Sequence, residues 1–100
     1  MTDGVTVTLT IQLTPEAAEH FAAGLPGLFV DTRKFPGCRG IEAFSSQSDP
    51  GRFIFIERWD SAADYHAYLA WRDTRGEGLG SITAVSTAPP VVEIWDGPIA

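Results

Sequence analysis

The sequence predicts an α+β fold in which two helices cover one face of a four-stranded antiparallel sheet. The predicted elements follow the order β-α-β-β-α-β, which is the ferredoxin-like arrangement. The length of 100 residues, with 44% hydrophobic and 20% charged residues, is typical of a single globular domain over residues 1–100. The third predicted strand is apolar on both faces, which predicts that both faces of the sheet are buried.

A strand and a long helix form the first part of the domain. The segment Val5 to Leu13 alternates apolar residues with Thr and Gln, and a period of two indicates a strand. The triplet Thr14-Pro15-Glu16 then supplies a capping hydroxyl, a proline suited to the first helical position and an acid at the positive end of the helix dipole. The helix is predicted from Pro15 to about Lys34. The segment Gly24 to Gly27, which contains a proline, predicts that it kinks or splits.

A hairpin of two strands follows this helix. Cys38 to Phe44 and Arg52 to Trp59 are the predicted strands. The loop between them, Ser45 to Gly51, is rich in turn-forming residues. The two strands are therefore expected to pair antiparallel.

A second helix and a last strand complete the pattern. The helix is predicted from Ala62 to about Arg75, after a turn and cap at Asp60-Ser61. Ser81 to Ala88 is predicted to be a loop with at most a helical turn. Pro89-Pro90 precedes the last strand, Val91 to Trp95.

The third strand predicts that the sheet is buried on both faces. Phe53 and Phe55 point to one side of it, while Ile54 and Ile56 point to the other. Two helices can cover only one face, so the other face is expected to pack against the same sheet of a second copy. Five or six large side chains at about 1.5–3 kcal/mol each would otherwise face water. We therefore expect a homodimer with a barrel-like core.

Composition and charge exclude several classes of function. Seven basic residues against thirteen acidic ones give a formal charge of −6. Nucleic-acid binding is not expected, because phosphate recognition depends on Lys and Arg. No apolar run reaches 18 residues, and no signal-like pattern opens the sequence. These features predict a cytoplasmic protein without a membrane partner.

Metal and disulfide sites are not expected either. The single cysteine, Cys38, cannot form an internal disulfide or a thiolate metal site. It has no basic neighbour that the sequence places, which favours a buried and unreactive thiol. The two histidines, His20 and His66, lack nearby carboxylates at metal-ligand spacing.

Several short motifs occur along the chain in an order that resembles a known family. They are Val5–Leu13, Thr14-Pro15-Glu16, Phe35-Pro36-Gly37-Cys38, Asp49-Pro50-Gly51-Arg52-Phe53, Glu57-Arg58-Trp59-Asp60-Ser61 and the helical segment Tyr65–Arg72. Together they resemble the antibiotic biosynthesis monooxygenase domain. The resemblance covers nearly the whole chain and lies in the order and spacing of the motifs.

The resemblance implies a dimeric α+β barrel and, for some members, oxygenation of phenolic or quinol substrates without a metal or flavin cofactor. Other members degrade haem with an Asn, a Trp and a His, and the matching positions here are about Leu9, Tyr68 and Gly78. All three depart from that pattern, so haem degradation is not expected. Many members also carry a His at the position of Tyr68, whereas this chain has His66 two residues earlier.

The expected chemistry needs an apolar pocket with one or two polar groups, between the helices and the sheet. At 100° per residue, Tyr68 and Arg72 share one broad face of the second helix. Tyr68 could bond a substrate oxygen, or could be a packed tyrosine with its hydroxyl at the rim. Arg72 could pair with a phenolate or carboxylate, or with Glu57 or Asp73, or extend to water. His66 has a pKa suited to a base, although its position indicates a solvated face.

Aromatic residues supply the candidate walls of this pocket. Trp71 could stack on an aromatic ligand, or lie in the core or the dimer interface. Tyr65, on the same helix face, is a further candidate for substrate contact. The remaining candidates, each with ordinary core packing as the alternative, are Trp59, Phe21 and Phe29.

Two functions from different classes follow. The first is a cofactor-independent monooxygenase that oxidises a polycyclic phenol or quinol with O₂. The alternative is a non-catalytic module of the same fold that binds a small ligand or serves in assembly. An open cavity of about 300 Å³ or more favours the enzyme, and a cavity filled by Tyr68 and Trp71 favours the module.

Overall fold

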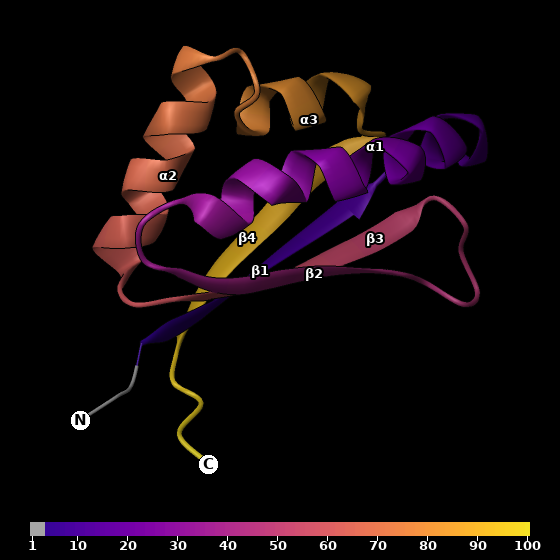
Figure 1. Cartoon of the computed structure of the whole chain (residues 1–100). Helices are drawn as coiled ribbons and strands as arrows, with labels where there is room; N and C mark the ends of the chain where they lie inside the picture. Colours follow the sequence, from indigo (N-terminus) through magenta and orange to yellow (C-terminus); the bar gives the residue numbers. More distant parts are fainter. Residues whose placement is uncertain (1–3) are drawn as a thin grey trace.

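A computed structural model describes residues 4–100, apart from the side chains of residues 79–81. The four strands form one antiparallel sheet in the order β2-β3-β1-β4. The predicted α+β, ferredoxin-like fold is confirmed (Figure 1). The elements in chain order are β1 (Val5–Gln12), α1 (Pro15–Lys34), β2 (Cys38–Ser45), β3 (Arg52–Trp59), α2 (Ala62–Thr74), α3 (Leu79–Val85) and β4 (Ala88–Asp96).

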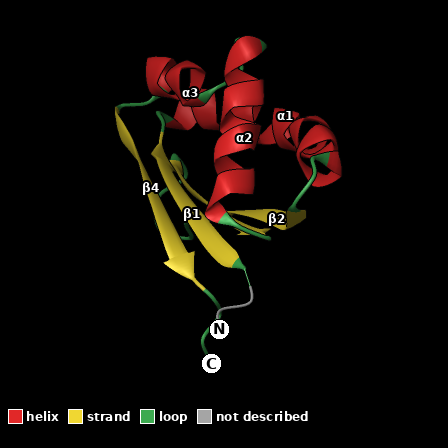
Figure 2. Cartoon of the chain, turned by 90° about the vertical axis from the view of Figure 1, so that its left-hand side faces the viewer, coloured by secondary structure: helices red, strands yellow, loops and turns green. Residues whose placement is uncertain are grey.

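The helices all lie on one side of the sheet, as Figure 2 shows. On that inner face, Val7 of β1 lies opposite Glu57 of β3, and Leu9 lies opposite Phe55. Every second residue of β1 and β3 is buried, which confirms the predicted alternation. The sheet therefore carries the core on one face and leaves the other uncovered by this chain.

A kink or a split was predicted at Gly24 to Gly27, and the split is wrong because α1 is one continuous helix. Ala18, Leu25 and Phe29 form a buried stripe that runs past the proline. Pro26 itself lies on the exposed side. The lost backbone bond at that position is offset by packing of the opposite side on the sheet.

A third helix replaces the loop predicted over Ser81 to Ala88. Helix α3 begins at Leu79, after the N-cap residue Gly78, which supplies no side-chain cap, and Ile82 packs against the core. At its end the Ser86 hydroxyl donates to the carbonyl of Ile82 at 2.6 Å. Local sequence signals for this helix are weak, so tertiary packing decides its conformation.

The last strand is longer than predicted, because it begins at Ala88 rather than Val91. It contains both Pro89 and Pro90. Strand β4 lies at an edge of the sheet, where a missing N–H is tolerated. The pairing between β1 and β4 shifts register between Thr10 and Gln12, which is the part of β1 opposite the two prolines.

None of the helices in the described part of the chain combines the length and the hydropathy required to cross a bilayer.

Candidate active site

An internal cavity of about 40 Å³ lies between the sheet and the helices, where the pocket was expected. Strands β1 to β3 form its floor, and α1, α2 and the connection from α2 to α3 form its walls. Its lining is mostly apolar, with Glu57, Tyr65, Tyr68, Arg72 and Glu77 as the residues with polar side chains. The apolar lining residues are Leu9, Leu28, Phe29, Ile41, Phe55, Leu69, Gly78 and Ile82.

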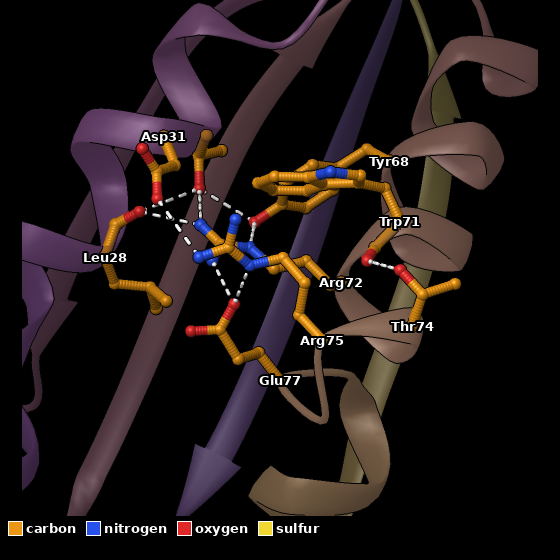
Figure 3. Close-up of polar contacts among 9 residues, drawn as sticks. Leu28, Asp31, Tyr68, Trp71, Arg72, Thr74, Arg75 and Glu77 are labelled. Carbon is orange, nitrogen blue, oxygen red and sulfur yellow. Dashed lines mark hydrogen bonds and ion pairs between the residues drawn. The ribbon is translucent and has the colours of Figure 1, made fainter.

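Arg72 is the most highly connected polar group of the cavity and is only 2% exposed. Its Nε donates to the Tyr68 hydroxyl at 2.9 Å, and one terminal nitrogen donates to the Leu28 carbonyl at 2.7 Å. The same nitrogen donates to the Thr32 hydroxyl at 3.0 Å, and the other donates to Glu77 at 3.1 Å (Figure 3). Arg72 therefore links α2 to α1 and to the connection before α3.

The partner of Arg72 differs from both candidates named from the sequence. Its carboxylate partner is Glu77 rather than Glu57 or Asp73. Nor does the guanidinium extend to water, since the side chain is buried. Glu77 lies five residues away and just beyond the end of α2, so a helical spacing rule could not find it.

The Tyr68 hydroxyl belongs to the same network and does not lie at the rim. Its oxygen is 2.7 Å from the Thr32 hydroxyl and accepts from Arg72. Burial raises the pKa of Tyr68 above its ordinary value, while the hydrogen bonds with Thr32 and Arg72 act in the opposite direction. The tyrosine is therefore neutral at pH 7.

Glu57 is a buried carboxyl in the floor of the cavity, with 3% exposure. Trp59 Nε1 donates to its Oε1 at 3.0 Å. Burial raises the pKa of Glu57 from an ordinary 4.5 to about 7, and the bond from Trp59 opposes this shift only in part. A carboxyl with this pKa can take or give a proton near neutral pH.

Sequence reasoning missed Glu57 as a site residue. The signal was present, because Glu57 occupies the apolar phase of β3 between Phe55 and Trp59. A carboxyl is almost never fully buried unless it has a role or a partner. An acidic residue at a strand position whose side chain points into the core is therefore a stronger indicator of a functional site than a histidine on a helix.

The Tyr65 hydroxyl is buried and has no hydrogen-bond partner among the described residues. Burial is the main cause that raises the pKa of Tyr65, and the nearby Glu57 carboxyl adds to it. Buried hydroxyls are normally paired, so an unpaired one in a cavity wall is suited to bond a bound molecule. Tyr65 was among the predicted substrate contacts.

The other predicted aromatic residues surround this site at different depths. Phe29 lines the cavity directly. Trp59 is fully buried beneath Tyr68, with ring centres 5.0 Å apart. Trp71 is partly buried, and the Arg72 guanidinium lies 5.1 Å from its ring centre. Phe21 packs against Phe53 and Phe55, further along α1 and outside the cavity.

The structure places His66 on the exposed side of α2, where it contacts the Tyr65 ring but does not line the cavity. Its suggested role as a base stays a prediction. His20 is exposed on α1. Cys38 is half-buried rather than buried. Burial raises the pKa of its thiol, while the Arg33 guanidinium acts in the opposite direction, and the predicted lack of reactivity stays a prediction. Among the residues that the structure describes, no group of three or more His, Cys, Asp and Glu side chains is placed to hold a metal ion.

A wider groove of about 470 Å³ lies on the surface between α1 and the edge strand β2. Its charged groups are Arg33 and Glu42, both exposed. Arg33 donates to the Ile41 carbonyl at 3.0 Å. Because the groove holds no buried ionisable group, the internal cavity is the better candidate for chemistry despite its smaller volume.

The stability of the protein is expected to fall by about 2 to 3 kcal/mol between about pH 4.5 and 7 because of Glu57. The pKa of this acid is raised to about 7 in the folded state. Over this interval the folded chain binds more protons than the unfolded chain, so a rise in pH favours unfolding. Above about pH 7 both states are ionised and the loss levels off. Urea unfolding at several pH values measures the effect.

The Glu57→Gln variant is the matched control, because it removes only the titrating group. The difference in unfolding free energy between variant and wild type should grow in favour of the variant up to about pH 7. A difference that stays constant from pH 4.5 to 8 would contradict the assignment.

Comparison with known proteins relates the chain to a protein family. The family model described as antibiotic biosynthesis monooxygenase matches residues 4–75, which include β1 to β3, α1 and α2. No curated protein sequence matches the chain.

Solved structures also resemble the chain over nearly its full length. One is a crystal structure of an antibiotic biosynthesis monooxygenase, with a TM-score of 0.80 and 27% identity over 93% of this chain and 97% of that chain. A candidate antibiotic biosynthesis monooxygenase from Deinococcus radiodurans has a TM-score of 0.81 at 23% identity, covering 96% and 94%. A conserved protein from Methanosarcina mazei Go1 has a TM-score of 0.82 at 17% identity, covering 96% and 94%. The last two likenesses show the shared fold.

Proposed function

The chain belongs to the antibiotic biosynthesis monooxygenase family, and from this membership we propose that it oxidises a phenolic or quinol aromatic compound with O₂, without a cofactor. The observation that carries the proposal is Glu57, a buried carboxyl with a pKa of about 7 in an aromatic cavity. Such a group can deprotonate a phenol where water is excluded.

The proposed reaction uses electrons that the substrate itself supplies. Glu57 takes the hydroxyl proton of the enol form, and the resulting anion gives one electron to O₂. The substrate radical and superoxide combine through a new C–O bond, and a proton from Glu57 gives a hydroperoxide. Loss of the remaining C–H proton and of hydroxide then leaves a carbonyl. In sum, a ring CH₂ and O₂ become C=O and water, with four electrons passing from carbon to oxygen.

The remaining polar groups have separate proposed roles. The Tyr65 hydroxyl, which has no hydrogen-bond partner among the described residues, would bond the substrate oxygen. It lies close enough to Glu57 for the carboxylate charge to raise the pKa of Tyr65. Tyr68 and Arg72 would place a positive charge and a neutral donor at the other wall of the cavity, where they favour an anionic substrate. Phe29 and Leu69 would hold the ring system.

Substrate entry requires part of the cavity wall to move. A volume of about 40 Å³ holds water molecules but no ring system. The wall made by Glu77, Gly78 and Ile82 is the part that belongs to the connection and to the short helix α3. Such connecting segments are the usual lids of enzyme sites.

The cavity volume of about 40 Å³ is below the volume of about 300 Å³ expected for an enzyme, and Tyr68 lines the cavity whereas Trp71 does not. This small volume favours the alternative function, a non-catalytic module that binds a small ligand. Both functions use the same walls. They differ in whether O₂ is consumed, and one measurement therefore separates them.

The experiment is O₂ uptake by metal-free protein supplied with anthrone or with hydroxylated naphthalenes and anthracenes. We expect one O₂ consumed for each carbonyl formed, at a rate above that of buffer. Binding of these compounds without O₂ uptake would support the non-catalytic module. Neither binding nor uptake across the panel would overturn the proposed function.

We also propose that a second copy of the chain covers the outer face of the sheet. Phe44 is 47%, Val91 62% and Trp95 49% exposed on this face, around the partly buried Ile54 and Ile56. Phe44 lies on the edge strand β2, and Val91 and Trp95 lie on the other edge strand, β4. The register places all three opposite to the face that carries the helices. The threonines of β1, Thr6, Thr8 and Thr10, lie between these apolar residues on the same face. Large apolar side chains exposed on one face of a sheet are typical of an interface between subunits.

Substitution of Trp95 by glutamate is expected to weaken this dimer at least about tenfold, because a carboxylate in an apolar interface loses its hydration. Val30→Glu is the matched control, since Val30 is 48% exposed but lies on α1, away from this face. Sedimentation equilibrium should give twice 10.8 kDa for the wild type and the control. A wild type that sediments as a single chain at micromolar concentration would rule out the dimer.

A further inference from the structure

We infer that the cavity takes an aromatic ligand that carries a carboxylate, and that the Glu77 side chain occupies the position on Arg72 that this carboxylate takes. The inference rests on the proposed function in treating this cavity as the substrate site. It names the class of substrate more narrowly, as an aromatic acid.

The first step of the argument is the charge of Arg72, which is nearly fully buried. Three of its four partners are uncharged, namely the Tyr68 hydroxyl, the Thr32 hydroxyl and the Leu28 carbonyl. Glu77 is the one carboxylate bonded to it within the described residues. A buried guanidinium needs an anion close by, so the position held by Glu77 is suited to a carboxylate.

The second step is the position of Glu77, whose side chain is 38% exposed. It lies in the connection between α2 and α3, directly after Gly76, which has a positive φ of 70°. Its Oε1 also accepts from Arg75 Nε at 2.9 Å, on the exposed side (Figure 3). Glu77 can therefore leave Arg72, keep a cationic partner and enter water at small cost.

The third step is the shape of the surroundings. Arg72 and Glu77 both line the cavity, and removal of the Glu77 side chain would enlarge it. The ring of Tyr68 lies beside the guanidinium, which is 5.4 Å from the ring centre. An aromatic ligand could pack beside the Tyr68 ring, and its carboxylate would take Nη1 of Arg72, the terminal nitrogen that Glu77 holds.

The fourth step is the separation of like charges. Both Glu57 and Arg72 line the cavity, but Glu57 on β3 is bonded by Trp59, whereas Arg72 is bonded to Tyr68, to groups of α1 and to Glu77 before α3. A ligand with its carboxylate on Arg72 would therefore keep that charge away from Glu57. Its hydroxyl would be free to approach the base.

The experiment measures binding by calorimetric titration with 2-naphthoate and with its neutral counterpart, 2-naphthamide. Glu77→Gln removes the competing carboxylate and should raise the affinity for 2-naphthoate at least about fivefold. Affinity for 2-naphthamide should change less than twofold. Asp73→Asn is the matched control, because Asp73 is an exposed acid on the same helix without a bond to Arg72.

The outcomes separate this inference from the proposed function. Equal gains in Glu77→Gln and Asp73→Asn would show a general charge effect and overturn the inference, as would no binding of 2-naphthoate by Glu77→Gln at millimolar concentration. If neutral quinols are oxidised while 2-naphthoate does not bind, the proposed function stands and the inference fails. If the Glu77 effect is found without O₂ uptake by any quinol, the inference stands and the proposed function fails.

Discussion

Replacement of Glu57 by glutamine is expected to lower the turnover of a quinol substrate by about 10² to 10⁴-fold. The amide has nearly the same shape, so packing against Trp59 and Tyr65 is retained. It cannot accept the substrate proton, and the anion that reduces O₂ is then formed only by slower routes. The measurement is the initial rate of O₂ uptake at saturating substrate.

Two further readouts make this test specific to proton transfer. In the wild type, kcat/KM should rise with pH through about 7, the pKa of Glu57, because only the ionised carboxylate acts as a base. In the variant this rise should disappear. Glu42→Gln, an exposed position on β2, should keep both the rate and the pH profile. Full activity of the Glu57 variant would exclude Glu57 as the base.

Replacement of Arg72 by methionine is expected to lower the free energy of unfolding by about 4 kcal/mol, which is four hydrogen bonds at about 1 kcal/mol each. Methionine keeps much of the buried volume but leaves the Leu28 carbonyl and the Tyr68 and Thr32 hydroxyls with fewer partners. Urea unfolding followed by tryptophan fluorescence measures the loss.

Arg75 provides the control for that prediction, since its side chain is 48% exposed and its ion pairs are at the surface. Arg75→Gln should cost less than about 1 kcal/mol. If both variants lost the same small amount, the network around Arg72 would not hold α1 against α2.

Most strands and both long helices could be predicted because their signals are local. The alternation along Val5–Gln12 and the cap at Thr14 each lie within a few residues. Helix α3 could not be predicted, because its conformation depends on packing of Ile82 against a core formed by distant segments. Continuity of α1 past Pro26 has the same cause.

In the candidate site, too, the residues with local sequence signals could be predicted, and most of those that depend on long-range contacts could not. Helical geometry placed Tyr68 and Arg72 on one face, and the structure brings them together in one network. Thr32 and Glu77 were missed because their contacts cross from α1 and from the connection to α2. Glu57 was missed although its place in the strand pattern indicated burial. The homodimer, the substrate and the cytoplasmic location stay predictions.

Arg72 joins the two long helices and also faces the cavity, so one guanidinium serves both architecture and recognition. A substitution of Arg72 that changes ligand recognition would therefore also break the link between the two helices. Divergence in ligand preference among relatives should therefore accumulate at aliphatic wall positions such as Leu28, Ile41 and Leu69, which can change size one at a time. A library of variants restricted to these positions should yield more folded proteins with new preferences than one that includes Arg72.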